Sequence, residues 1–363
     1  MNSEHKHPLW HPSFKLNGLS FDSVQELEEF LHTLRIQGDQ HEVDLAEFIS
    51  QWLSADPHIE SYTSGTTGTP KKCLLSKQKM QLSAQTTGTF FDIGPGASAL
   101  LCLPLSFIAG KMMVVRAMVL GWDLHLVAPA KDALTQYDSK YDFVALVPHQ
   151  LAHSYRALDK VNTLIVGGGV LPNHLEEKLQ ASAVKAYATY GMTETLTHVA
   201  ARRLNGPQRS EVYKAMPDVR FTRDNRGCLV IHAPNLIEKP LITNDLVKII
   251  DEYSFEYLGR VDDVINSGGV KHAPEVLERK LGQYLSGQFV ISSLLHESLG
   301  EQIVLVKDAK GPSKEDIDRA ITHLSPVERP KLIINLEAMP VTDTGKIKRK
   351  QLRDLIRNQQ HLL

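Results

Sequence analysis

Short apolar segments alternate with helical patterns across the middle of the chain, and this alternation limits the possible folds most strongly. Apolar runs over residues 99–103 and 124–128 predict strands, and the pattern between them, over 111–120, predicts a helix that Gly121 ends. Parallel neighbours need such a crossover connection. We therefore expect an α/β fold with a large N-terminal domain of layered, mostly parallel sheets and helices. The other elements expected here are strands over 143–147, 163–166 and 184–187 and helices over 76–91 and 175–183.

The segments before and after this region have different patterns. Apolar residues recur at helical spacing from residue 22 onward, and a second helix is expected over 45–53. Between residues 210 and 258 the runs become short and are separated by turns, which predicts a small antiparallel sheet or barrel. Its expected strands cover 228–232, 246–250 and 255–258.

The pattern changes once more after Gly259-Arg260, where a compact α+β region is expected. We therefore predict two domains, residues 1–260 and a mobile C-terminal domain of residues 261–363. The elements expected in the second domain are helices over 274–281 and 313–324 and strands over 288–295 and 302–307.

Composition and charge fit a soluble globular protein. Of the 363 residues 42% are hydrophobic and 23% are charged, and the formal net charge of −2 gives no indication of nucleic-acid binding. One basic run, Lys346 to Lys350, resembles a nucleic-acid patch or a localisation signal, but it also fits a solvated loop at the start of a helix.

The cysteines and the N-terminus indicate the cellular compartment of the protein. Three widely spaced cysteines argue against a disulfide framework. The polar start of the chain lacks the apolar stretch of a signal peptide. The longest uncharged run, residues 93–110, contains Pro95 and Pro104 and suits buried strands and turns better than a membrane helix. We expect a cytoplasmic protein without a membrane span.

The segment Ser61–Lys72 predicts a loop that holds a polyphosphate. Glycines let backbone N–H groups converge on an anion, hydroxyls donate to phosphate oxygens, and lysine adds a positive charge. The segment is not a Walker A loop, because Pro70 stands at the place of the second glycine and Lys72 at that of the Ser or Thr. The alternative is a polar surface turn.

Five further segments have residue types suited to nucleotide chemistry. A glycine turn after a strand is where α/β proteins bind ligands, an aromatic ring can stack on a base, and a carboxylate can bind Mg²⁺ beside phosphates. Each of these segments alone is also compatible with an ordinary turn. In chain order they are Val166–Gly169, Tyr190–Thr195, Thr243–Asp245, Gly259–Gly269 and Pro340–Arg349.

In this order the six segments resemble those of the AMP-forming adenylating superfamily, which contains acyl- and aryl-CoA synthetases, adenylation domains and luciferases. The resemblance extends from Tyr62 to Leu352, and the phosphate loop and the Gly-Arg-x-Asp-Asp segment are its most specific parts. It implies a ligase that uses ATP, Mg²⁺ and coenzyme A and forms an acyl-adenylate.

The resemblance also implies roles for individual residues. Thr193, Glu194 and Lys346 would be catalytic, with Glu194 binding Mg²⁺, and Asp262 would be the hinge of the mobile domain. Gly268 and Gly269 would lie beside CoA. The ATP phosphates would be held by Thr63, Ser64, Gly65, Thr66, Thr67, Gly68 and Lys71, and the adenine and ribose by Gly167, Gly168, Gly169, Tyr190, Asp245 and Arg260.

Within the superfamily the segment Leu103–Ala117 is similar to that of the o-succinylbenzoate–CoA ligases of menaquinone biosynthesis, which have an arginine at the spacing of Arg116. The substrate is a dianion, and Arg116 would hold the carboxylate that does not react. The alternative is a surface arginine whose stem covers apolar groups. His149 would also border the acyl pocket. Ser106-Phe107 departs from the aromatic–His pair usual in the superfamily.

Three further expectations stay open. The acid could be another aryl or acyl carboxylate, or the acceptor a carrier protein. The chain could instead be a non-catalytic nucleotide-binding module, although the retained Glu194, Asp245, Arg260 and Lys346 argue against this. The region before the phosphate loop is shorter than in most relatives, and an apolar face left uncovered there would favour a homodimer.

Overall fold

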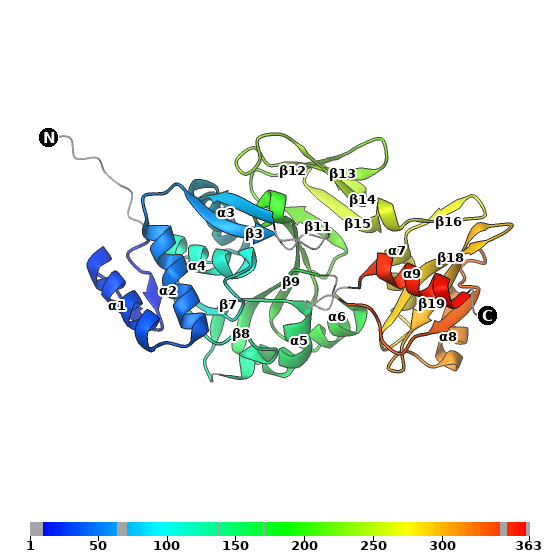
Figure 1. The fold of residues 1–363 in the computed structure, drawn as a ribbon, viewed down its shortest axis with the longest axis horizontal. Helices are drawn as coiled ribbons and strands as arrows, with labels where there is room; N and C mark the ends of the chain where they lie inside the picture. The colour runs from blue at the N-terminus through cyan, green and yellow to red at the C-terminus, as the bar shows by residue number, and fades with distance from the viewer. Residues whose placement is uncertain (1–9, 64–70, 137, 170, 342–346, 361–363) are drawn as a thin grey trace. The chain divides into compact units, whose positions relative to one another are not determined.

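A computed structural model describes residues 10–63, 71–136, 138–169, 171–341 and 347–360 (Figure 1). The chain forms two compact units. The first contains residues 1–167, 179–220 and 232–241, and the second contains residues 168–178, 221–231 and 242–363. The domain boundary expected at residue 260 separates a mobile C-terminal part from the rest of the chain. These two compact units do not test that motion, so the boundary stays a prediction.

The first unit is built on a largely parallel sheet, which confirms the expected fold class. Its strands run in the order β11-β10-β9-β8-β7-β5-β6-β1-β2. All pairs from β9 to β1 are parallel, and antiparallel pairs occur at the two ends, between β9 and β10, β10 and β11, and β1 and β2. The strands are β1 (Lys15–Leu16), β2 (Leu19–Ser20), β5 (Ser98–Leu101), β6 (Asp123–Leu126), β7 (Tyr141–Leu146), β8 (Val161–Val166), β9 (Lys185–Gly191), β10 (His198–Arg203) and β11 (Val212–Ala215).

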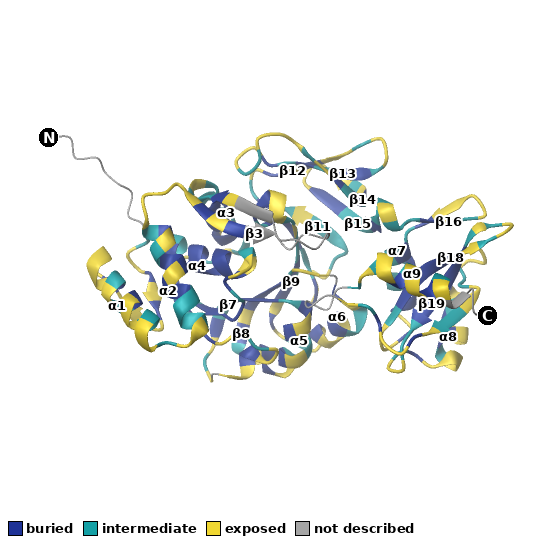
Figure 2. Ribbon diagram, in the orientation of Figure 1, coloured by how far each residue is buried: buried dark blue, intermediate teal, exposed yellow. Residues whose placement is uncertain are grey.

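Helices cover this sheet and share a core with it (Figure 2). Helix α4 is buried over most of its length, as Met112 to Met118 are all buried, and its C-cap is Gly121, as predicted, with a left-handed φ of 75°. Helix α2 begins at Gln40, before the predicted residue 45, because the carboxylate of Glu42 accepts the N–H of Asp39 and fixes an earlier first turn. The helices are α1 (Val24–Gln37), α2 (Gln40–Leu53), α3 (Lys77–Phe91), α4 (Ile108–Leu120) and α5 (Pro148–Ser154).

The second unit contains two groups of strands. The first follows the order β12-β13-β14-β15, in which β14 and β15 are antiparallel, in agreement with the predicted small antiparallel sheet. The second has the order β17-β16-β19-β18, with β20 beside β19. The strands are β12 (Arg220–Arg223), β13 (Cys228–His232), β14 (Leu241–Asp251), β15 (Ser254–Arg260), β16 (Ile265–Ser267), β17 (Val270–His272), β18 (Phe289–His296), β19 (Gly300–Lys307) and β20 (Leu332–Asn335).

Successive side chains of β18 and β19 point to opposite faces of this second sheet, and both faces are buried. Ile291 and Leu305 pack with α7 and α8, whereas Val290 and Val306 pack with α9 on the other face. The helices are α6 (Asn173–Leu179), α7 (Pro274–Leu281), α8 (Lys314–Ala320) and α9 (Arg349–Gln360). Short 3-10 helices in the two units are η1 (Ala133–Thr135), η2 (Tyr155–Lys160), η3 (Thr193–Thr195), η4 (Val261–Asp263) and η5 (Ile321–His323).

Within the described ranges, no helix is both long enough and apolar enough to span a bilayer.

Candidate active site

The predicted phosphate loop lies between two paired strands, β3 (His58–Thr63) and β4 (Lys71–Ser76). The strands are antiparallel, and Thr63 stands directly opposite Lys71 at the end of the ladder from which the loop leaves. Ser64 to Gly68 lie outside the described residues, and Thr63 and Lys71 are described by their backbone alone. The assignment of this segment to the ATP phosphates therefore stays a prediction.

The Tyr190–Thr195 segment follows the sheet edge where ligands bind in α/β proteins. Tyr190 is the penultimate residue of β9 and pairs with Ala200, and its ring meets the ring of Tyr213 edge-on at 6.0 Å. Thr193 and Glu194 follow in η3 and are exposed. A Cβ at Gly191 would collide with the backbone of Thr197 and His198, which explains the glycine at this turn.

Glycines also follow β8. Gly167 lies in the first unit, where an added Cβ would stand 2.6 Å from the hydroxyl oxygen of Thr189. Gly168 and Gly169 belong to the second unit, and Gly168 has a left-handed φ of 79°. A glycine is needed at position 167 because the Thr189 side chain packs close to its backbone, and at position 168 because the backbone is left-handed.

Arg116 lies inside the first unit and is 3% exposed, which excludes the alternative of a surface arginine. Its Nε donates to the hydroxyl of Thr87 at 3.3 Å, and its Nη2 donates to the hydroxyl of Thr197 at 3.0 Å and to Nδ1 of His198 at 3.4 Å. Within the described residues no carboxylate lies within ion-pair distance of it. Burial lowers the pKa of Arg116 to about 9, because the charged form is desolvated.

The sequence did not indicate His198 or Thr87 as members of this cluster. His198 is buried in the same way, and its pKa is well below the usual value because of its burial and the positive charge of Arg116. His198 also lines a surface pocket of about 230 Å³ between α3 and the segment 216–219.

His149 lies elsewhere in the first unit. It is exposed in the first turn of α5, and its ring stands 4.6 Å from that of His153. It is not among the hydrogen-bond partners of Arg116 described above. Its expected role in acyl binding stays a prediction.

The second unit brings together three of the residues that the sequence singled out. Asp245 on β14 pairs across the ladder with Arg260 at the end of β15, and their side chains form an ion pair at 3.5 Å. Arg260 also donates to Asp262 at 3.1 Å, and Asn244 donates to the same carboxylate at 3.2 Å. Burial lowers the pKa of Arg260, but the hydrogen bond to Asp262 and the charge of Asp245 outweigh it and raise the pKa.

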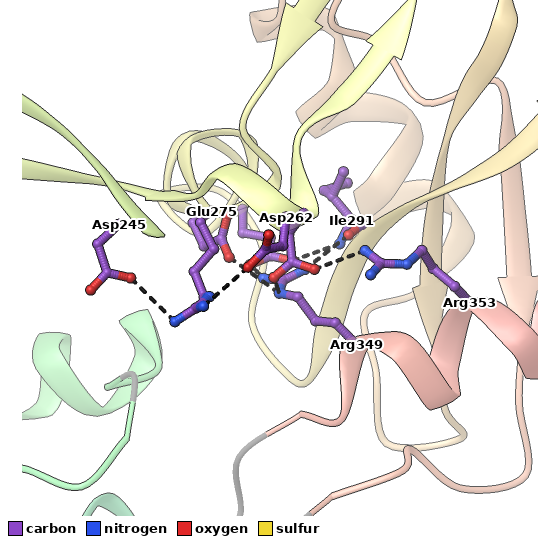
Figure 3. Close-up of polar contacts among 9 residues, drawn as sticks. Asp245, Asp262, Glu275, Ile291, Arg349 and Arg353 are labelled. Atoms are coloured by element: carbon purple, nitrogen blue, oxygen red, sulfur yellow. Dashed lines mark hydrogen bonds and ion pairs between the residues drawn. The ribbon is translucent and has the colours of Figure 1, made fainter. Parts of the chain in front are cut away.

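A second, denser network surrounds Arg349 at the start of α9 (Figure 3). Its guanidinium lies 3.2 Å from Glu275, 2.7 Å from Glu278 and 3.8 Å from Asp263, and it donates to the carbonyl of Ile291 at 3.1 Å. Arg353, one turn further along α9, donates to Asp263 at 2.8 Å. The sequence indicated Arg349 only as the last residue of the Pro340–Arg349 segment and did not indicate its carboxylate partners.

The glycine of the Gly259-Arg260 segment is explained by this network. Gly259 has a φ of 140°, and a Cβ there would collide with the carboxylate of Glu275. Gly268 and Gly269 form the two-residue turn between β16 and β17, where Ser267 pairs with Val270, and both have left-handed φ angles, 58° and 81°. Their expected contact with CoA stays a prediction, and Lys346 lies outside the described residues.

Comparisons with known proteins agree with these features. A model of the AMP-binding enzyme family matches residues 19–226. The 2-succinylbenzoate–CoA ligase of Geobacillus sp. (strain WCH70) is 26% identical over 344 residues, which cover 83% of this chain and 69% of that one. The probable 2-succinylbenzoate–CoA ligase of Mycobacterium tuberculosis is 26% identical over 348 residues, with 86% and 88% covered.

Solved structures show the same relationship. An acyl-CoA synthetase (AMP-forming)/AMP-acid ligase II-like protein from Dyadobacter fermentans has a TM-score of 0.61 and 32% identity and covers 89% of this chain and 97% of that one. Wild-type E. coli MenE with a bound analogue of OSB-AMS has a TM-score of 0.63 at 20% identity, covers 82% and 68%, and shows the likeness in fold. The chain therefore belongs to the AMP-binding enzyme family, in the class of AMP-forming acid–CoA ligases.

Proposed function

We propose that this protein converts o-succinylbenzoate to its CoA thioester, a step of menaquinone biosynthesis, through an acyl-adenylate. One observation carries the choice of acid: Arg116 is a buried guanidinium with neutral partners only, among the residues described. A buried charge without a counter-ion is costly, so an anionic ligand is expected to balance it. The relatives named as 2-succinylbenzoate–CoA ligases support the same acid.

The chemistry has two halves. In the first, an oxygen of the substrate carboxylate attacks the α-phosphorus of ATP, and the bond to the leaving pyrophosphate breaks. In the second, the thiol sulfur of CoA attacks the acyl carbon, the bond to the phosphate oxygen breaks, and AMP leaves while the thiol proton goes to solvent. Negative charge builds up at the α-phosphate in the first half, so positive groups and N–H donors must be in place beforehand.

The predicted site residues supply these groups in the proposed mechanism. Lys346 would lie against the carboxylate and the α-phosphate during adenylation, and Thr193 would donate to the α-phosphate. Tyr190 would border the adenine together with Gly167 to Gly169, and Asp245 with Arg260 would hold the ribose. The phosphates would be bound by Thr63, Ser64, Gly65, Thr66, Thr67, Gly68 and Lys71.

Glu194 fits a Mg²⁺ site. Its carboxylate is exposed on the short η3 turn, and Mg²⁺ in nucleotide sites takes one or two carboxylates together with phosphate oxygens and water. Among the described residues no group of three or more His, Cys, Asp or Glu side chains is arranged to hold a metal ion, so the phosphates would supply the remaining ligands. When bound, the ion neutralises the charge of the phosphates.

The two halves need different groups at one site, and we propose that residues 261–363 rotate relative to residues 1–260 between them. The contacts around the expected hinge support this division. The side chain of Asp262 is held by Arg260 and Asn244, which precede the hinge, whereas Asp263 is held by Arg353 of α9, which follows it. Rotation at Asp262 would withdraw Lys346 and bring Gly268 and Gly269 beside CoA.

Two further parts of the proposal are the cellular context and the assembly. We propose a cytoplasmic enzyme, since ATP, CoA and the small acid are its only expected partners, and Cys102 and Cys228 are free thiols. A homodimer is also proposed, because the apolar side chains of Leu19, Val24 and Ile36 are exposed in the N-terminal region.

The test is a panel of acids assayed with ATP, Mg²⁺ and CoA, with pyrophosphate, AMP and thioester measured separately. The panel contains o-succinylbenzoate, benzoylpropionate (the same acid without the ring carboxylate) and simple aryl and acyl acids. We expect the highest kcat/KM for o-succinylbenzoate. Faster turnover of a monocarboxylate would disprove the proposed acid, and adenylation without CoA transfer would favour a carrier protein as the acceptor.

A further inference from the structure

The contacts of Arg116 determine the protonation of His198. A guanidinium carries only N–H donors, so Nδ1 of His198, 3.4 Å from Nη2 of Arg116, must be the acceptor. The ring hydrogen of a neutral imidazole then lies on Nε2, which faces the hydroxyl oxygen of Thr87 at 3.3 Å. The cluster therefore requires a neutral His198 in one tautomer, as its lowered pKa also indicates.

Thr87 closes the cluster. Its hydroxyl donates to the carbonyl of Ser83 at 2.9 Å and accepts from Nε of Arg116 and from Nε2 of His198. A hydroxyl has one donor and two acceptor positions, and here all three are used. Arg116, Thr87 and His198 thus form a closed ring of hydrogen bonds, in which a shift of any one member breaks a bond.

One nitrogen of the Arg116 guanidinium, Nη1, has only a weak hydrogen-bond acceptor among the described residues. Nε and Nη2 have the oxygen and nitrogen partners described above, whereas the hydrogen-bond partner of Nη1 among the described residues is the sulfur of Met113 at 3.6 Å. A thioether is a weak acceptor. A carboxylate at Nη1 would form a charge-assisted bond and would balance the buried charge.

We propose that Thr87 and His198 are positioning residues that fix Arg116 and leave its Nη1 for the second carboxylate of the acid, and so set the preference for dianionic over monoanionic acids. The inference rests on the proposed function. A guanidinium already held by its neighbours loses little conformational freedom when the anion binds. A protonated His198 would repel Arg116 and remove the acceptor, so its neutral state is part of the arrangement.

The experiment compares three variants of the full chain: Thr87→Val, His198→Leu and the matched control Thr86→Val. Thr86 lies beside Thr87 on α3 and also donates to the carbonyl of Ser83 at 2.9 Å, but it is not a hydrogen-bond partner of Arg116 or His198. KM and kcat are measured for o-succinylbenzoate and for benzoylpropionate, and the thermal midpoint is recorded for each variant.

For Thr87→Val and His198→Leu we expect KM for o-succinylbenzoate to rise roughly ten- to a hundredfold, the cost of losing a hydrogen bond to a charged group, with little change in kcat. KM for benzoylpropionate, which lacks the second carboxylate, should stay at the wild-type value. The control Thr86→Val should leave both acids unaffected. Thr87→Val preserves the side-chain shape, so it remains informative if His198→Leu does not fold.

Two further substitutions of His198 distinguish a positioning role of this residue from a role in packing alone. His198→Asn places an amide oxygen near the position of Nδ1 and should retain most of the preference for the dianion, whereas His198→Lys places a second cation beside Arg116 and should abolish it. An unchanged ratio of kcat/KM for the two acids in folded Thr87→Val and His198→Leu would overturn the inference and leave the proposed function intact. A wild-type enzyme without any preference for the dianion would instead refute the proposed acid, and this inference with it.

Discussion

Arg116 and Arg349 are both withdrawn from solvent, but their surroundings are opposite. Arg116 is 3% exposed and has hydroxyl, imidazole and thioether partners. The side chain of Arg349 is 18% exposed, and three carboxylates converge on it. Burial lowers the pKa of both groups, but in Arg349 the charges of Glu278, Glu275 and Asp263 outweigh burial and raise the pKa.

The difference separates a structural charge from a functional one. The counter-ions of Arg349 belong to the fold, so this guanidinium ties α9 to α7 and to Asp263. Among the described residues the fold supplies no counter-ion to Arg116, which is the condition expected of a group that a ligand neutralises. Stability should therefore depend strongly on Arg349 and weakly on Arg116.

The largest effect is expected for Arg349→Met. The substitution leaves the carboxylates of Asp263, Glu275 and Glu278 close together without their shared cation, so the free energy of unfolding should fall by about 3 kcal/mol, the lower end for a buried pair because the site is partly exposed. Denaturant unfolding followed by circular dichroism gives this value. Arg319→Met is the control, since Arg319 is 79% exposed and its solvent-screened pair with Asp316 should contribute little to stability. Equal losses in the two variants would contradict the structural role of Arg349.

The sequence was sufficient to predict the layers of the fold. Apolar runs, glycine caps and periodicity are local properties, and they indicated the central strands β5 to β8, the end of α4 at Gly121 and the α+β character of the C-terminal part. Local patterns were weaker where an element is short or packed on both sides. The two-residue strands β1 and β2 and the start of α2 depended on tertiary contacts or on a single cap.

The two arginine clusters could not be predicted in this way. His198 is 82 residues from Arg116 and 111 from Thr87, and Arg349 is 71 residues from Glu278. Contacts over such separations are made by the fold and leave no periodic signal in one sequence. The similarity of Leu103–Ala117 to related ligases indicated Arg116 itself, but not the neutral partners that hold it.

The pH dependence of stability tests the carboxylates around Arg349, and Glu275 in particular. Burial and then the neighbouring Glu278 and Asp263 raise the pKa of Glu275 to about 7 in spite of Arg349, and its Oε2 is buried without a hydrogen-bond partner among the described residues. An unfolded chain releases this proton near pH ~4.3. Between that pH and about 7 the folded state binds more protons, so the contribution of Glu275 to stability falls as the pH rises.

Glu275→Gln should remove this part of the pH dependence. We compare the free energy of unfolding of the wild type with that of the variant. The difference, wild type minus variant, should fall by about 1–3 kcal/mol as the pH rises from ~4.5 to ~7.5. Denaturant titrations at several pH values in this window give the difference. A difference that stays constant with pH would show that Glu275 is ionised throughout and that Arg349 outweighs its burial.

The smallest change in stability is expected for Arg116→Met, although turnover of o-succinylbenzoate should fall sharply. Methionine replaces a desolvated charge with an apolar side chain of similar length, and such replacements are often neutral or stabilising. The neutral partners remain satisfied, because Thr87 still bonds Nε2 of His198 at 3.3 Å and Thr197 lies 3.4 Å from Nδ1. The free energy of unfolding should therefore stay within about 1 kcal/mol of the wild-type value. A loss as large as that of Arg349→Met would mean that the fold itself depends on the charge of Arg116, and the distinction between the two arginines would not hold.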